Sequence, residues 1–87
     1  MGLSEVKTLL GIESNNTTND NRLNEYLNIA TNIHSGYNNT STHYSKCIDL
    51  YACLLYLTFT NSTNKDTLEF FSESYQLELN QLYGDTT

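Results

Sequence analysis

Residues 44–60, YSKCIDLYACLLYLTFT, decide how the rest of this chain must fold. Within residues 50–59 only Thr58 is polar, and apolar residues do not alternate with polar ones along the segment. The segment is also longer than a typical strand, so the pattern predicts a helix. Because a helix that is apolar on every side belongs in a protein interior, we expect the other segments to cover it.

This central helix is predicted to span about residues 43–60 and to be too short to cross a membrane. A transmembrane helix needs about 20 predominantly apolar residues, and this segment is interrupted by Lys46 and Asp49. The expected N-cap is one of the hydroxyl residues Thr40, Ser41 or Thr42. If the helix is the centre of the fold, Cys53, Leu54 and Leu57 should not be more exposed than Leu23 and Leu27.

A short first helix is predicted over residues 3–11, LSEVKTLLG. Ser4 is the expected N-cap, and Gly11 is the expected left-handed stop. The apolar residues of this segment form one narrow stripe, which consists of Val6, Leu9 and Leu10. Because two turns of helix are not stable alone in water, this helix must dock on the body of the protein.

Two longer amphipathic helices flank the central one. The second helix is predicted to begin at a cap at Asn19 or Asp20, after a polar loop, and to end at Gly36. Its apolar positions are Leu23, Tyr26, Leu27, Ala30, Ile33 and Tyr37. The last helix is predicted to begin at a cap at Asn64 or Asp66 and to run to about Tyr83. Its apolar stripe is wide, with Leu68, Phe71, Tyr75, Leu79 and Leu82 on one face and Phe70, Leu77 and Tyr83 on an adjoining face.

These segments predict an all-α fold, a small four-helix bundle with one short and three longer helices around a central apolar helix. The loops between the helices are short, which favours antiparallel packing of neighbours. With 87 residues the chain has room for one domain, residues 1–87, and one modest core.

The charge balance argues against a nucleic-acid-binding face. The chain has ten acidic and four basic residues, a net charge of −6 at pH 7. Contacts to phosphates need clustered Lys and Arg, whereas the basic residues here are scattered along the sequence as Lys7, Arg22, Lys46 and Lys65. The acids are interpreted as a solvated surface.

No set of residues predicts catalysis, a metal site or a cofactor. His43 and Cys47 are spaced as two ligands on one helix, but neither His34 nor a nearby carboxylate supplies a third. Cys47 and Cys53 would lie about 9 Å apart on the central helix, too far for a disulfide, so both are expected to be free core thiols. Isolated glycines form no phosphate-binding loop. We therefore expect a protein that is not an enzyme.

Seven tyrosines are many for a chain of this length. A tyrosine combines a large apolar ring with a polar tip, so it is tolerated at the edge of a core and enriched at protein–protein interfaces. Each single tyrosine could lie at a core edge, but so small a bundle should not bury all of them. The candidate interface residues are Tyr26, Tyr37, Tyr75 and Tyr83.

The N-terminal half of the chain resembles the head–tail connector (adaptor) family of tailed bacteriophages. The resemblance is carried by the segment LSEVKTLLGI, a polar loop, and then DNRLNEYLNIATNIHSGY. The matching positions are Leu3, Val6, Lys7, Leu10, Gly11 and Ile12, followed by Asp20, Leu23, Leu27 and Ala30. The loop departs from the family pattern because Asn and Thr stand where acids are common.

This resemblance implies a structural virion protein, made in the host bacterial cytoplasm and located in the neck of the particle. A homo-oligomeric ring, twelve-fold on the portal protein, would extend the DNA channel and offer an attachment surface to a tail or stopper protein. DNA would pass through without specific binding, which suits an acidic wall. The resemblance implies no catalytic residue, no cofactor and no membrane.

Two further classes of function stay open. One is a small regulatory or inhibitor protein that binds a single protein partner through a tyrosine-rich helical face, and the other is an accessory subunit of an enzyme. A closed ring of more than two subunits needs two different contact surfaces on each subunit. For the ring we expect these surfaces on the second helix, with Tyr26 and Tyr37, and on the fourth, with Tyr75 and Tyr83.

Overall fold

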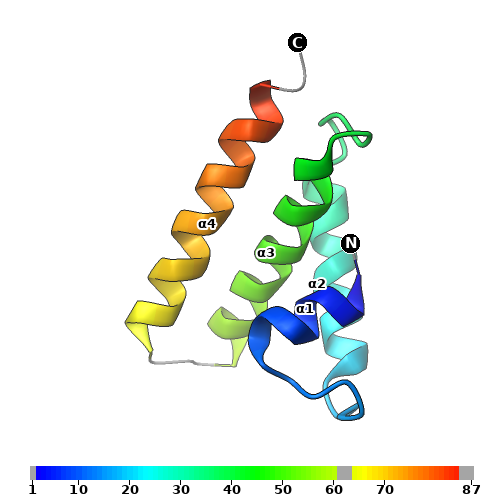
Figure 1. The fold of residues 1–87 in the computed structure, drawn as a ribbon. Coiled ribbons are helices and arrows are strands. Elements are labelled where there is room, and N and C mark those ends of the chain that lie inside the picture. The colour runs from blue at the N-terminus through cyan, green and yellow to red at the C-terminus, as the bar shows by residue number, and fades with distance from the viewer. Residues whose placement is uncertain (1, 61–63, 85–87) are drawn as a thin grey trace.

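The computed structural model describes residues 2–60 and 64–84. The chain forms four helices, α1 (Leu3–Leu10), α2 (Asp20–Ile33), α3 (Thr42–Phe59) and α4 (Lys65–Gly84) (Figure 1). The described ranges contain no strand. The prediction of an all-α fold, a small four-helix bundle, is therefore confirmed. No helix in these ranges has the length and apolar character that crossing a membrane requires.

Helix α3 is the organising element of this bundle. It packs against each of the other three helices, whereas α4 packs against α3 alone (Figure 1). Helix α2 lies along another side of α3, and the short α1 lies across both α2 and α3. The long helices thus form a layer in the order α2, α3, α4, and the molecule is flat, with extents of 39 × 25 × 18 Å.

Burial along α3 differs between its two halves. Residues from its first turn to Cys53 supply much of the core, namely Tyr44, Cys47, Ile48, Asp49, Leu50, Ala52 and Cys53. Leu54 and Leu57 are only half-buried, while Leu23 on α2 is fully buried. The expectation of burial on all sides is therefore wrong for the last turns of α3. Helix α1 has only eight residues, so it cannot cover its side of α3 along the whole length.

Three predicted helix ends are confirmed by local hydrogen bonds. The Ser41 hydroxyl oxygen accepts the N–H of His43 at 3.1 Å and caps α3. The side-chain oxygen of Asn64 accepts the N–H of Thr67 at 3.1 Å at the start of α4. Gly11 adopts a left-handed φ of 74° after α1, and the hydrogen bonds from Gly11 and from the next residue form a Schellman stop.

Two other predicted ends are wrong. Helix α1 begins two residues earlier than a cap at Ser4 requires, with Gly2 in the cap position and no side-chain cap bond. Helix α2 ends at Ile33 and does not reach Gly36. There the chain turns, because the N–H of Tyr37 donates to the carbonyl of His34 at 3.1 Å, and the fully buried ring of His34 anchors the turn.

Candidate protein-interaction surfaces

An aromatic cluster joins the end of α2 to α3 and α4. Its members are His34, Tyr37, Tyr51, Tyr75 and Tyr83. The imidazole of His34 is fully buried and has both nitrogens bonded. Since the Ala30 carbonyl can only accept, Nδ1 donates to it at 2.7 Å, and in the neutral ring Nε2 accepts from the Tyr75 hydroxyl at 2.8 Å. The cluster thereby ties α4 to the end of α2.

The phenols of this cluster are weak acids. Burial raises the pKa of Tyr75 to about 12. The hydrogen bond between the hydroxyls of Tyr37 and Tyr83, 2.7 Å long, raises the pKa of Tyr37. Both side chains stay protonated at physiological pH and act as hydrogen-bonding groups rather than as bases or nucleophiles.

The structure places the four candidate interface tyrosines differently from the expected arrangement. Tyr37 lies beyond the end of α2 and contacts Tyr83 of α4 directly, so separate tyrosine faces on the second and fourth helices are wrong. Tyr26 is buried in the core, where its ring stacks on Phe59 with centroids 5.8 Å apart. Tyr75 is half-buried, and Tyr83 is about half exposed. A role of these tyrosines in binding stays a prediction.

Helix α4 carries an exposed apolar stripe, defined here as Phe70 and Leu77. These side chains are 62% and 68% exposed and lie two helical turns apart on one side. That side faces away from α3, because α4 buries Phe71 and Leu82 toward it. The wide apolar pattern of this helix was predicted, and the structure shows that one part of it has no covering helix.

Helix α2 carries a second exposed apolar group, the α2 flank, defined as Ile29 and Ile33. These side chains are 43% and 49% exposed and lie one turn apart. The prediction of Ile33 in the buried stripe is wrong, because His34 turns inward in its place and is fully buried. Ile29 was not part of the predicted apolar stripe of the second helix. Its position outside that stripe was the one sign of this surface in the sequence.

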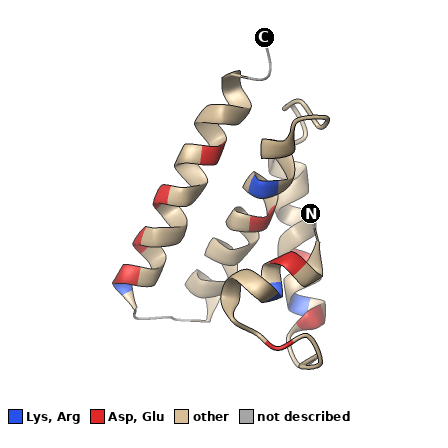
Figure 2. Cartoon of the chain, viewed as in Figure 1, with Lys and Arg blue, Asp and Glu red and all other residues tan. Residues whose placement is uncertain are grey.

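The α4 stripe and the α2 flank lie on the two outer helices of the layer, with α3 between these helices. Among the helices α4 packs against α3, and α2 lies on another side of α3 (Figure 1). Acidic side chains follow one another along α4 (Figure 2). Asp66, Glu69 and Glu73 on this helix are exposed. Helix α4 is thus acidic beside its stripe, while α2 carries both the exposed Arg22 and the exposed Glu25.

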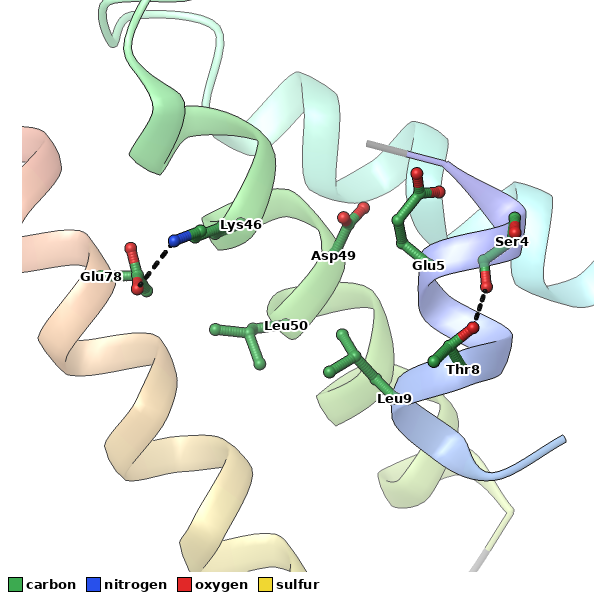
Figure 3. A pocket seen from close by; sticks show the side chains of 8 residues that line it. All are labelled: Ser4, Glu5, Thr8, Leu9, Lys46, Asp49, Leu50 and Glu78. Carbon is green, nitrogen blue, oxygen red and sulfur yellow. Dashed lines mark hydrogen bonds and ion pairs between the residues drawn. The ribbon is translucent and has the colours of Figure 1, made fainter.

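A groove of about 510 Å³ lies between α1 and α4 over α3 (Figure 3). Its lining residues are Ser4, Glu5, Thr8, Leu9, Lys46, Asp49, Leu50 and Glu78. Glu78 accepts from His43 Nδ1 at 2.5 Å and lies 4.0 Å from Lys46 Nζ, which links α4 to α3. The sequence did not reveal this groove, because its residues come from three helices. Its lining combines apolar Leu9 and Leu50 with charged residues of both signs.

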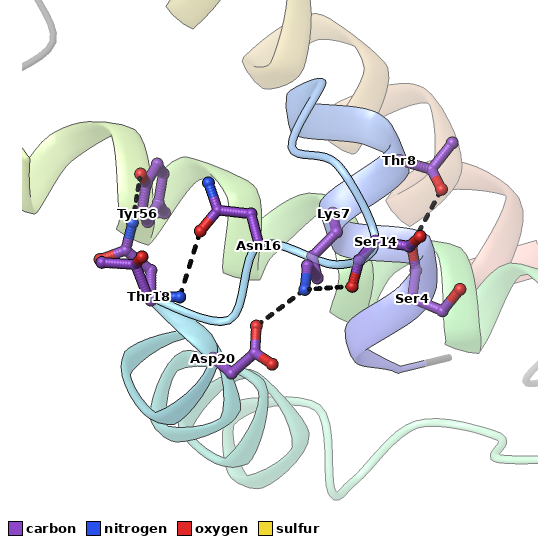
Figure 4. A network of polar contacts seen from close by, with 9 residues as sticks. Ser4, Lys7, Thr8, Ser14, Asn16, Thr18, Asp20 and Tyr56 are labelled. Atoms are coloured by element: carbon purple, nitrogen blue, oxygen red, sulfur yellow. Dashed lines mark hydrogen bonds and ion pairs between the residues drawn. The ribbon is translucent and has the colours of Figure 1, made fainter.

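Two buried polar groups hold α1 in place. Lys7 is buried, and its Nζ donates to the Ser14 carbonyl at 3.1 Å and to Asp20 Oδ1 at 2.9 Å (Figure 4). Asp49 accepts the N–H of Gly2 at 3.1 Å. Burial raises the pKa of the Asp49 carboxyl, and the Gly2 bond opposes this shift. From the sequence, Lys7 was counted only among the scattered basic residues, and its structural role was missed.

The structure does not bring metal-ligating residues together within residues 2–60 and 64–84, where no three His, Cys, Asp or Glu side chains could hold a metal ion. Cys47 and Cys53 are free and fully buried, as predicted. Burial raises the pKa of these thiols to about 11 and about 12, so they are poor nucleophiles at neutral pH. The four basic residues lie on four different helices and form no basic patch.

Comparison of the chain with protein-family models, with curated proteins and with solved structures finds no match.

Proposed function

We propose that this chain is the structural subunit of a homo-oligomeric ring, of the head–tail connector type of tailed bacteriophages. The observation that supports the proposal is the pair of exposed apolar groups on two different helices, the α4 stripe and the α2 flank. A subunit of a closed ring needs two different surfaces, one for each neighbour. A protein that binds one partner needs only one such surface.

The charge of the molecule supports the same function. Acids follow one another along α4, and each helix contributes a single base (Figure 2). A negative surface repels the DNA phosphates, so a ring of such subunits would let DNA pass without holding it. In the proposed assembly the ring sits beneath the portal protein in the virion neck and offers its other face to a tail or stopper protein.

Each neighbour contact would be small, because each exposed group has only two large apolar side chains. Interfaces of this kind are weak when they act alone. We therefore expect free subunits to be monomeric in dilute solution and to close into a ring on the portal, where many contacts form together.

Electron microscopy of the purified chain mixed with portal rings from the same genome tests this function. The expected result is a second ring stacked on the portal, with an axial channel wide enough for duplex DNA. A single copy bound to a host protein, with no ring on the portal, would instead support the regulatory or inhibitor function. The half-exposed Tyr83, bonded to Tyr37, would then be the expected contact surface.

A further inference from the structure

We infer that Tyr37 and Tyr83 form a site of oxidative crosslinking, at which a one-electron oxidant joins the two phenol rings by a carbon–carbon bond. Tyr83 lies near the C-terminal end of α4, opposite the end that follows α3 in the chain (Figure 1). Tyr37 lies in the connection between α2 and α3. The crosslink would therefore fasten the C-terminal end of α4 covalently to this connection, and the site does not depend on the proposed ring.

The two rings are held side by side by a hydrogen bond. The Tyr37 hydroxyl donates to the Tyr83 hydroxyl at 2.7 Å, and the ring centroids lie 5.2 Å apart. Two phenols that met only at their hydroxyl tips would have more distant centroids, so the two rings converge toward their hydroxyl groups. The ring carbons next to a hydroxyl group, the ortho carbons, are the atoms at which phenoxyl radicals couple. The geometry thus brings the reacting ends of the two rings together.

The pair is also the tyrosine contact that is most accessible to an oxidant. Tyr83 is 51% exposed, more than any other tyrosine of the chain, and its bond with Tyr37 is open to solvent. Tyr51 and Tyr75 form another close pair, with ring centroids 5.4 Å apart, but both are half-buried. The Tyr75 hydroxyl is in addition bonded to the buried His34. Oxidation from solvent should therefore begin at Tyr83.

The coupling removes one hydrogen atom from each phenol. Hydrogen peroxide, acting through a haem peroxidase, takes one electron and one proton from each of the two phenols and is reduced to two molecules of water. The two phenoxyl radicals then form a single bond between their ortho carbons. The hydrogen atom on each of these carbons is transferred to the adjoining oxygen, which restores both hydroxyl groups.

The crosslink would close a long loop of the chain. Tyr37 and Tyr83 are 46 residues apart in the sequence. A covalent link across such a loop restricts the unfolded chain and thereby stabilises the folded state. We therefore expect the crosslinked chain to unfold at a higher urea concentration than the untreated chain.

Treatment of the full chain with hydrogen peroxide and a haem peroxidase, at low protein concentration, tests the site. The expected result is dityrosine fluorescence in the monomer and a linked pair of peptides that contain residues 37 and 83. The variant Tyr83→Phe should lose this product. The matched control Tyr51→Phe, which removes the other close pair, should keep it, and circular dichroism checks that both variants fold.

A photochemically generated ruthenium(III) complex, which is a small one-electron oxidant, should give the same product. Absence of dityrosine from the monomer with both oxidants would overturn the site, as would dityrosine that joins separate chains only. A monomer crosslink that persists in Tyr83→Phe would place the reaction at another pair. An unchanged urea midpoint of the crosslinked chain would overturn the fastening of α4.

Discussion

Phe70 and Phe71 are adjacent on α4 and have the same side chain, yet the structure gives them opposite environments. Phe71 is 4% exposed and packs in the core, whereas Phe70 projects away from α3. Phe71 is one of the two buried residues of α4, which packs against α3. Replacing each phenylalanine in turn by alanine therefore tests which face α4 presents to the core.

The expected costs differ severalfold. Truncation of a buried phenylalanine typically costs about 3 to 5 kcal/mol, through lost burial and the cavity left behind. Phe70 has one described ring contact, with Phe71 at 5.5 Å between centroids, and such a pair contributes about 0.5 to 1.5 kcal/mol. We expect Phe71→Ala to lower the free energy of unfolding by about 3 kcal/mol or more, and Phe70→Ala by about 1 kcal/mol or less.

Urea unfolding followed by far-ultraviolet circular dichroism measures both costs on the same scale. In a domain of this size a loss of 3 kcal/mol lowers the melting temperature by more than about 10 °C. Phe71→Leu, which keeps most of the apolar volume, should recover most of the stability. Equal losses for the two alanine variants, or a larger loss for Phe70→Ala, would show that α4 presents a different face to α3.

Three further predictions concern buried groups. Lys7→Ala should lower the free energy of unfolding by about 1 to 3 kcal/mol, because it leaves Asp20 without its partner, and a cost near zero in urea unfolding would contradict this. Burial raises the pKa of the Asp49 carboxyl above its usual value of 3.8. At pH values just above 3.8, the folded protein therefore binds more protons than the unfolded chain. As the pH rises through this range, the free energy of unfolding of the natural chain should therefore fall relative to that of the Asp49→Asn variant. If the free energies of unfolding of the two proteins changed with pH in the same way, the pKa shift would be refuted. Cys47 and Cys53 should resist a thiol reagent at pH 8 until urea unfolds the chain, and rapid labelling of the folded protein would contradict their burial.

Features set by neighbouring residues could be predicted from the sequence. The caps at Ser41 and Asn64 and the stop at Gly11 depend on hydrogen bonds within a few residues, so the local residue types indicate them. The central place of α3 could be predicted from its apolar residues, because no other segment has apolar residues on so many sides of a helix.

Features set by distant residues could not be predicted in the same way. Helix α2 ends before Gly36, and the buried His34 at its end bonds Tyr75, more than forty residues away. Lys7 is buried because Ser14 and Asp20 satisfy its charge, and the sequence does not show that they lie within reach. The loss of burial toward the end of α3 depends likewise on the path of α1 across the bundle.

The tyrosines show why residue type alone could not locate the interaction surface. A phenol ring is equally suited to a core edge and to an interface, and the choice depends on what lies opposite its hydroxyl group. In Tyr37 and Tyr75 that group is bonded within the subunit, to Tyr83 and to His34. The side chains left most exposed on α4 are instead Phe70 and Leu77, which have no polar group to bond.

Helix α4 links the stability of the subunit to its assembly. A chain of 87 residues buries a limited fraction of its surface, and here its longest helix is covered on one side only. In the proposed ring, a neighbouring subunit that covers Phe70 and Leu77 would give α4 a second packing partner without enlarging the chain. Ligands that bind only the folded state stabilise it, and in a ring every subunit is such a ligand for the next. Burial of this exposed stripe would therefore make the closed ring more stable than its separate subunits.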